Sequence, residues 1–175
     1  MASQLSKAVA GRVLAVTLSL SAAGFAGWQA SEGFTDHAVI PTEGDVPTIG
    51  YGSTRYEDGS RVKMGDRITR ERAAELAMNL AQKDCALMAK SLPGVKLYQV
   101  EYDVYCDFVG QYGIGTFRKS SIRKYLLEGN YAAACQALLL YKYAAGYDCS
   151  TPGNKRCYGV WERQLKRHST CMGVQ

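Results

Sequence analysis

The feature that most limits how this chain can fold is an uncharged run from Val13 to Ala30. Residues 1–12 before it are polar, carry Lys7 and Arg12, and contain no acid. A basic flank followed by an apolar run is typical of a chain that is exported or inserted into a membrane, with the basic end staying inside. In a helix of about 1.5 Å per residue, the run nearly spans a hydrocarbon core of roughly 30 Å.

The run is a weak membrane span, because its leucines are few and small residues are many: Ser19, Ser21, Ala22, Ala23, Gly24, Ala26 and Gly27. Four fates are open to it: a cleaved signal peptide, a permanent anchor, a weak anchor that later leaves the bilayer, or an ordinary buried N-terminal helix. Polar and small residues lower the cost of extraction and favour the weak anchor. We therefore expect residues 1–30 to be a releasable signal-anchor segment and residues 31–175 to form one domain.

The charge of the chain favours an anionic polymer as partner. Its 175 residues, enough for one domain with a real core, carry a net charge of +5. Lys7 and Arg12 account for two of these charges, which leaves +3 for residues 31–175. No basic block is interleaved with aromatic residues, so no nucleic-acid partner is predicted.

All six cysteines lie from residue 85 onward: Cys85, Cys106, Cys135, Cys149, Cys157 and Cys171. They form no Cys-x-x-Cys pair, so a zinc site is not predicted. Behind an export segment, an even number of cysteines favours disulfides over reduced thiols. Fifteen pairings are open to six cysteines, and only Cys149–Cys157 is singled out, because the residues between them are turn-forming.

The rest of the chain predicts an α+β domain. Residues 33–65 contain short Val/Ile pieces and the turn Glu57-Asp58-Gly59-Ser60, which favour a small lobe of β-hairpins. Thr69 is a predicted N-cap of a long helix that ends at Ser91-Leu92-Pro93-Gly94. Further helices are predicted from Gln99, with a break at residues 113–116, and then over 120–127, 130–141 and 161–171. The expected architecture is a small β-lobe and a larger helical lobe, bridged by the long helix and separated by a cleft.

The residues that favour a chemistry lie around this cleft. Cleavage of a glycosidic bond usually needs one protonated carboxyl group and one ionised carboxylate. Glu32 is the candidate acid, and Asp45 or Glu43 is the candidate second carboxylate. Thr48 is a candidate for orienting a water molecule, and Arg163 is a candidate cation beside Glu32.

Other chemistries find no support in the sequence. The only histidines are His37 and His168, and no Gly-x-Ser-x-Gly motif is present, which disfavours serine and cysteine hydrolases. Gly50-Tyr51-Gly52 lacks the pattern of a nucleotide-binding loop. No cofactor and no metal are implied.

With these residues the chain resembles the phage-type lysozymes, glycoside hydrolase family 24. The matching motifs are Glu32-Gly33-Phe34, Val46-Pro47-Thr48-Ile49-Gly50-Tyr51-Gly52, Lys63-Met64-Gly65-Asp66 with Ile68-Thr69, Phe108-Val109 with Gln111-Tyr112-Gly113, Gly115-Thr116-Phe117 with Ser120-Ser121, Gly129-Asn130-Tyr131 and Gly159-Val160-Trp161-Glu162-Arg163. The threonine hairpin around Thr48 is the most specific of them. The resemblance implies a lysozyme-like fold and hydrolysis of the β-1,4 bond between N-acetylmuramic acid and N-acetylglucosamine in peptidoglycan.

The same resemblance assigns the site. It places the catalytic acid on Glu32 and the threonine on Thr48, and it implies substrate contacts by Gln111, Phe117, Ser120 and Arg163. The family has an aspartate nine residues after the glutamate and six before the threonine, and these positions hold Pro41 and Thr42. Asp45 is then the expected water-activating carboxylate; the alternative is that the enzyme acts through Glu32 and Thr48 without a second carboxylate. The missing aspartate leaves two alternatives, a lytic transglycosylase and a non-catalytic, membrane-tethered peptidoglycan-binding protein.

The N-terminal segment resembles that of signal-anchor-release endolysins, a phage subset that enters the membrane by a weak helix and becomes active on leaving it. This resemblance implies a location in the host inner membrane through residues 13–30, then in the periplasm after release. The implied role is host cell lysis by a monomer. Residues 1–30 contain no cysteine, so thiol control from the anchor is not expected.

Overall fold

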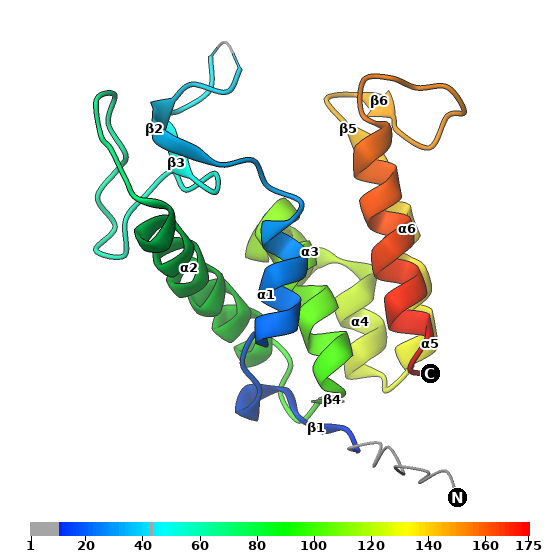
Figure 1. Ribbon diagram of the computed structural model, residues 1–175. Coiled ribbons are helices and arrows are strands. Elements are labelled where there is room, and N and C mark those ends of the chain that lie inside the picture. Colours follow the sequence, from blue (N-terminus) through cyan, green and yellow to red (C-terminus); the bar gives the residue numbers. More distant parts are fainter. Residues whose placement is uncertain (1–10, 43) are drawn as a thin grey trace, which may run out of the picture.

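Two long helices form the frame on which the other elements pack. The computed structural model describes residues 11–42 and 44–175, and in it α2 (Arg70–Lys90) and α3 (Gln99–Lys119) lie against each other (Figure 1). The Thr69 hydroxyl accepts a hydrogen bond from the backbone N–H of Arg72 at 3.2 Å, which confirms the predicted N-cap. A disulfide between Cys85 and Cys106 ties the two helices together.

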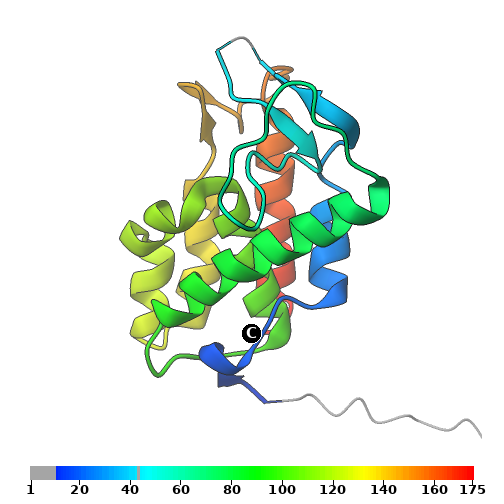
Figure 2. The same ribbon diagram turned by 90° about the vertical axis from the view of Figure 1, so that its left-hand side faces the viewer.

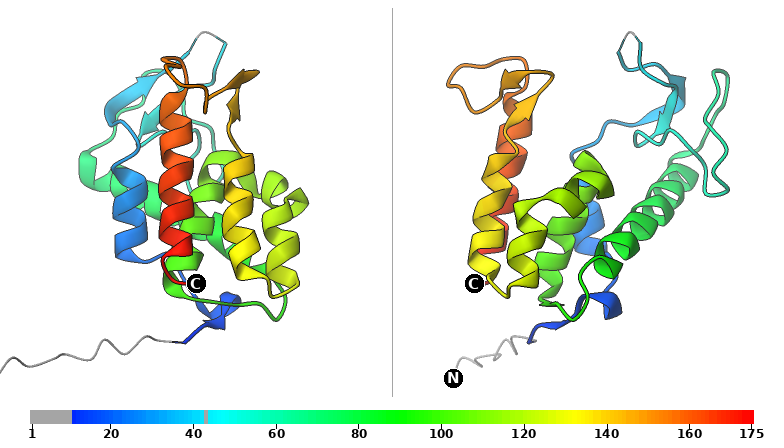
Figure 3. Two further views of the ribbon diagram at one scale, coloured as in Figure 1. Left: turned by 90° about the vertical axis from the view of Figure 1, so that its right-hand side faces the viewer. Right: turned by 180° about the vertical axis from the view of Figure 1, so that it is seen from behind.

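The predicted break in the second long helix is a kink. Gly113 has φ +80° and ψ 155°, a conformation that favours glycine, and the helix continues on both sides of it. The chain then forms α4 (Ser121–Leu127) and α5 (Tyr131–Ala137), with Asn130 as the N-cap of α5. Helix α6 (Tyr158–Met172) closes the lobe, and Cys135–Cys171 joins α5 to α6 (Figure 3).

The β-lobe is small and lies beyond the N-terminal end of α2 (Figure 2). Strands β2 (Thr35–Val39) and β3 (Thr48–Gly50) are antiparallel, with Val39 opposite Thr48 and an irregularity along the ladder. Arg55 and Arg61 form an isolated bridge around the predicted Asp-Gly turn. The predicted arrangement of β-lobe, long helix and helical lobe is therefore confirmed.

The segment from Gly11 to Ala30 folds onto the helical lobe. Strand β1 (Val13–Leu14) pairs with β4 (Lys96–Leu97), a 3₁₀ turn follows, and α1 (Ala22–Gln29) packs on α3. Ala15, Leu20 and Phe25 are buried in the same core as side chains of α2 and α3. Among the residues that the structure describes, no helix is both long enough and apolar enough to span a membrane.

Arg12 fixes the start of this segment. Its guanidinium donates to both carboxylate oxygens of Glu101, from Nε at 3.0 Å and from Nη2 at 2.8 Å. Glu101 is 0% exposed, so this pair is screened by solvent only on the arginine side. The guanidinium also lies 3.8 Å from the ring centroid of Tyr131 and 4.4 Å from that of Tyr98. Arg12 therefore holds the segment to α3 by charge, and to Tyr98 and to Tyr131 of α5 by aromatic contact.

A short hairpin precedes α6. Strands β5 (Tyr143–Ala144) and β6 (Tyr147–Asp148) are joined by Ala145 and Gly146, both with positive φ. The loop after β6 is closed by a disulfide between Cys149 and Cys157. The one cysteine pairing that the sequence singles out is thus confirmed.

Candidate active site

Glu32 lies where the helical lobe passes into the β-lobe. Its backbone N–H donates to Gln29 O at 3.2 Å, and the N–H of Ser31 donates to Trp28 O at 2.9 Å, so the last turn of α1 extends to the glutamate. Strand β2 begins three residues later, at Thr35. The position of the carboxyl group is therefore set by how α1 is seated.

The two oxygens of the Glu32 carboxyl group have different surroundings. Oε1 accepts a hydrogen bond from Nη1 of Arg163 at 3.1 Å. Oε2 faces the turn after β3, where a Cβ on Gly52 would lie 3.8 Å from it. The side chain is 30% exposed, so it is reachable from solvent while one of its oxygens is held in place. This arrangement suits a group that exchanges a proton with a bound molecule.

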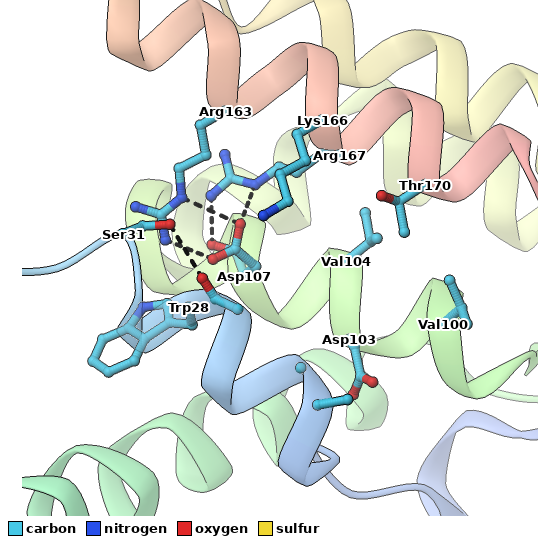
Figure 4. A pocket seen from close by; sticks show the side chains of 13 residues that line it. Trp28, Ser31, Val100, Asp103, Val104, Asp107, Arg163, Lys166, Arg167 and Thr170 are labelled. Atoms are coloured by element: carbon cyan, nitrogen blue, oxygen red, sulfur yellow. Dashed lines mark hydrogen bonds and ion pairs between the residues drawn. The ribbon is translucent and has the colours of Figure 1, made fainter.

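Asp107 joins Arg163 to a second arginine (Figure 4). It accepts from Nη2 of Arg163 at 2.5 Å and from Nε of Arg167 at 2.5 Å, and Arg167 also donates to the backbone oxygen of Asp107 at 2.9 Å. Nη1 of Arg167 donates to Gln111 Oε1 at 2.7 Å and to Gln164 Oε1 at 2.8 Å. Two carboxylates and two guanidiniums thus form one charge-balanced cluster that includes Glu32.

Burial and charge act in opposite directions on Asp107. Burial alone would raise the pKa of its carboxyl group, but the hydrogen bond from Arg163 and the charges of Arg167 and Arg163 outweigh it and hold that pKa below its usual value. Burial also lowers the pKa of the Arg167 guanidinium, against the attraction of Asp107. Asp107 is therefore an ionised counter-charge for both arginines.

Asp107 and Arg167 were not predicted from the sequence. A signal for Asp107 exists in the lone acid of the run Val104-Tyr105-Cys106-Asp107-Phe108-Val109, since a charge among buried residues needs a partner. A signal for Arg167 is its spacing of four residues from Arg163, which places both on one face of a helix. Neither residue is identified without knowing that α6 packs on α3.

The predicted partners of Glu32 in the β-lobe lie in and beside the link between β2 and β3. Thr48 begins β3, and its hydroxyl donates to Val39 O over 3.4 Å. Asp45 is exposed, and its Oδ1 accepts from the backbone N–H of Val46 at 2.8 Å. Within residues 11–42 and 44–175, no hydrogen bond or ion pair joins either residue to Glu32. Glu43, the other candidate carboxylate, lies outside the described residues.

The four predicted substrate contacts separate into two pairs. Gln111 and Arg163 line one open groove of about 450 Å³, together with Ser31 and Lys166. Phe117 is 0% exposed and packs against Phe108 in the core. The prediction that it contacts substrate is therefore wrong, and Phe117 is a core residue.

Ser120 is also buried, and its hydroxyl is used within the protein. It donates to Phe117 O at 2.7 Å and accepts from the backbone N–H of Arg123 at 3.1 Å, as the N-cap of α4. Its assignment to substrate is corrected to a capping role. In the part of the chain that the structure describes, no group of three or more His, Cys, Asp or Glu side chains is arranged to hold a metal ion.

Comparison with known proteins agrees with this geometry. Residues 29–167 match the family model for phage lysozyme. An endolysin of Salmonella phage P22 is 38% identical over 100 residues, which are 57% of this chain and 67% of that protein. A solved P22 lysozyme variant is 29% identical with a TM-score of 0.72, and covers 89% of this chain and 99% of its own.

A second solved structure, an endolysin from Escherichia coli O157:H7 phage FAHEc1, has a TM-score of 0.75 over 90% of this chain and 96% of its own. At 24% identity this likeness shows the fold alone. The lysozyme-like fold that the sequence predicts is confirmed by these neighbours.

Replacement of Asp107 by Asn tests the charge cluster. Two arginines then share one fewer counter-charge, and at neutral pH we expect a loss of about 3 kcal/mol in the free energy of unfolding, measured with urea. Because the pKa of Asp107 is depressed in the folded protein, its stabilisation is present above about pH 4 and is lost as the pH falls through the folded pKa. The difference between the two proteins should therefore shrink below about pH 4.

Glu128→Gln is the control, because Glu128 is exposed and its side chain makes no ion pair within the part of the chain that the structure describes, so its charge should contribute little. A difference between Asp107→Asn and the wild type that stays constant down to pH 2 contradicts the ionised role of Asp107.

Proposed function

Because this chain belongs to the phage lysozyme family, we propose that it is an endolysin that hydrolyses the β-1,4 bond between N-acetylmuramic acid and N-acetylglucosamine in bacterial peptidoglycan. The observation that carries this proposal is Glu32, a partly exposed carboxyl group held on one oxygen by Arg163 between the two lobes. Its site of action is the periplasm, where the glycan substrate lies. The enzyme acts as a monomer.

In the proposed reaction Glu32 is the general acid. Its carboxyl proton passes to the glycosidic oxygen as the C1–O bond breaks, and a water molecule adds to C1 and gives up a proton. Arg163 orients Glu32 through a hydrogen bond. Its positive charge is already balanced in part by Asp107, so it does not depend on Glu32 as its only counter-charge. Oε2 of Glu32, on the side of Gly52, is the oxygen free to face the leaving group.

The β-lobe supplies the groups for the water molecule. Thr48 has a hydroxyl that makes only a long bond to Val39 O and is available to orient water. We assign the removal of the water proton to Asp45, on the exposed link between β2 and β3. Neither step needs a cofactor.

Glu32→Gln should abolish lysis. The variant keeps the size of the side chain and removes its proton, so we expect at least about a 100-fold loss of muropeptide release from purified peptidoglycan, measured by mass spectrometry with the oxidised full chain. Products of the wild type should end in reducing N-acetylmuramic acid. Glu128→Gln is the matched control and should keep full activity, because Glu128 is exposed and lines none of the cavities beside α1 and Arg163.

The other products would identify the alternatives. Anhydro sugars would assign the enzyme to the lytic transglycosylases, and an absence of products from folded wild type would assign it to the non-catalytic binding proteins.

Asp45→Asn and Thr48→Ala separate the two candidates in the β-lobe. If Asp45 activates water, its variant should lose activity by about 100-fold with the same muropeptide products, and the loss should exceed that of Thr48→Ala. The measurement is the initial rate of muropeptide release at several pH values. Full activity of Asp45→Asn would remove Asp45 from the mechanism.

We also propose that residues 13–30 are held in the inner membrane before they take the fold described above. The uncharged run and the spread of apolar side chains around α1 support this proposal, since a helix that is apolar on all faces also suits lipid. Glu32 lies two residues beyond Ala30, so a membrane-held segment would keep the acid at the bilayer surface and out of the site. Release of the segment would then activate the enzyme.

Leucine at Ala22 and Ala26 tests this control. Both positions are exposed in the folded enzyme, so the double variant should fold normally while its segment leaves the bilayer less readily. We expect more protein in the membrane fraction of expressing cells and delayed lysis. The matched control carries glutamine at the same two positions and should behave in the opposite way. Unchanged fractionation and timing with leucine would refute the anchor.

A further inference from the structure

Helix α1, which ends just before Glu32, lies between two cavities. One, of about 320 Å³, is bounded by α1, α3 and α6, with Trp28 on one side and Lys166 on the other (Figure 4). The other, of about 230 Å³, is bounded by α1, the turn after β3, α2 and α3, and is also lined by Trp28. Helix α1 thus lacks close packing on both flanks, and its seat on α3 must fix its position.

That seat depends on two glycines. A Cβ on Gly24 would lie 2.6 Å from Cγ of Asp103, so the α1 backbone comes as close to α3 as glycine allows. Further along, a Cβ on Gly110 of α3 would lie 3.3 Å from Nε1 of Trp28. The two contacts set the height of α1 above α3, but neither prevents it from sliding along its axis.

Asp103 supplies a restraint on the N-cap itself, beside the two bonds that join Gln82 of α2 to the backbone of Leu20. Its Oδ1 accepts from the backbone N–H of Ser21 at 3.0 Å, and its Oδ2 accepts from the Ser21 hydroxyl at 2.5 Å. The same hydroxyl accepts from the N–H of Gly24 at 3.0 Å and is the N-cap of α1. The Asp103 carboxylate of α3 therefore accepts two hydrogen bonds from the N-cap of α1. It lies at the N-terminal end of that helix, where the helix dipole favours negative charge.

The same residue also orders the chain before α1. The side-chain amide of Gln99 donates to Oδ1 of Asp103 and to the backbone oxygen of Ser19, each at 2.9 Å. None of the three disulfides includes a residue of α1, whereas α2, α3, α5 and α6 are all cross-linked. Helix α1 can therefore shift while the frame of the protein stays folded.

We propose that Asp103 is a positioning residue for Glu32: by gripping Ser21 it fixes α1 along its axis, and so sets the place of the carboxyl group at the other end. The proposal rests on the role of Glu32 as the catalytic acid. Arg163 holds the carboxyl group itself, and Asp103 holds the helix that delivers it. A shift of α1 by about 1 Å would misplace the proton donor, which can lower a rate by about 100-fold.

Two variants of Asp103 test the proposal. Asp103→Asn keeps an acceptor for the N–H of Ser21 and loses the acceptor for its hydroxyl, whereas Asp103→Ala loses both. With a soluble peptidoglycan fragment as substrate, we expect kcat to fall about tenfold in the first and about 100-fold in the second, with KM within twofold of wild type. Ser21→Ala combined with Asp103→Ala should lower kcat no further than Asp103→Ala alone.

A second readout reports the seat of α1 without using activity. Trp161→Phe leaves Trp28 as the only tryptophan of the chain. Acrylamide quenching of its fluorescence then measures the solvent accessibility of the Trp28 ring, which rises if α1 moves away from α3. Quenching should increase in Asp103→Ala at a temperature where circular dichroism shows the fold intact. Thr170→Ala, which lines the same cavity and makes no bond to α1, is the matched control for both readouts.

The outcomes separate the two levels of the argument. An inactive but folded wild type would overturn the proposed function, whatever Trp28 reports. An active wild type with unchanged kcat in Asp103→Ala would overturn the positioning role, as would a fall in kcat that Thr170→Ala reproduces. Increased quenching together with a selective loss of kcat is the expected result.

Discussion

The site depends on the ion pairs that the Asp107 carboxylate forms with the guanidiniums of Arg163 and Arg167. Without this carboxylate, α3 and α6 would bring Arg163 and Arg167 together with one counter-charge fewer, and burial of such a pair is costly. With Asp107 bound to its Nη2, Arg163 can donate a hydrogen bond from Nη1 to Glu32. The orientation of the candidate acid is therefore a consequence of how two helices of the larger lobe pack, although the acid belongs to neither of them.

The contacts that stabilise the helical lobe differ from the contacts that position Glu32. Disulfides and buried side chains hold the helical frame, and none of the cross-links reaches α1. Polar contacts hold α1 at both ends, through Asp103 near its start and Arg163 just beyond its end. Polar contacts of this kind are lost and remade in water at small net cost, whereas buried apolar packing is not. The element that delivers the acid, in which Phe25 is the buried core residue, thus lies outside the cross-linked frame.

Local sequence patterns predicted much of this structure, and long-range packing accounts for what they did not predict. Thr69, Asn130 and the Cys149–Cys157 pair are defined by their near neighbours, so a short window suffices to identify them. Phe117 and Ser120 failed as substrate contacts because sequence does not tell which face of a helix turns inward after the kink at Gly113. Likewise, the run after Val13 has the same composition whether it lies in lipid or in a protein core, and only the partners of Ala15, Leu20 and Phe25 show its place in this fold. The division of the chain at residue 30 stays a prediction.

The ion pair between Arg12 and buried Glu101 bears on the proposed release of the N-terminal segment from the membrane. Arg12 stands at the basic edge of the uncharged run, the edge that remains in the cytoplasm when such a run crosses a bilayer. If residues 13–30 are first held in the membrane, as proposed above, Glu101 would lie in the domain on the opposite side. The two side chains can meet only when the whole segment, with its leading charge, has come to the same side as the domain. Under the anchor proposal the ion pair would therefore form only after the segment has left the bilayer, and a segment still held there would leave the Glu101 carboxylate without this cation.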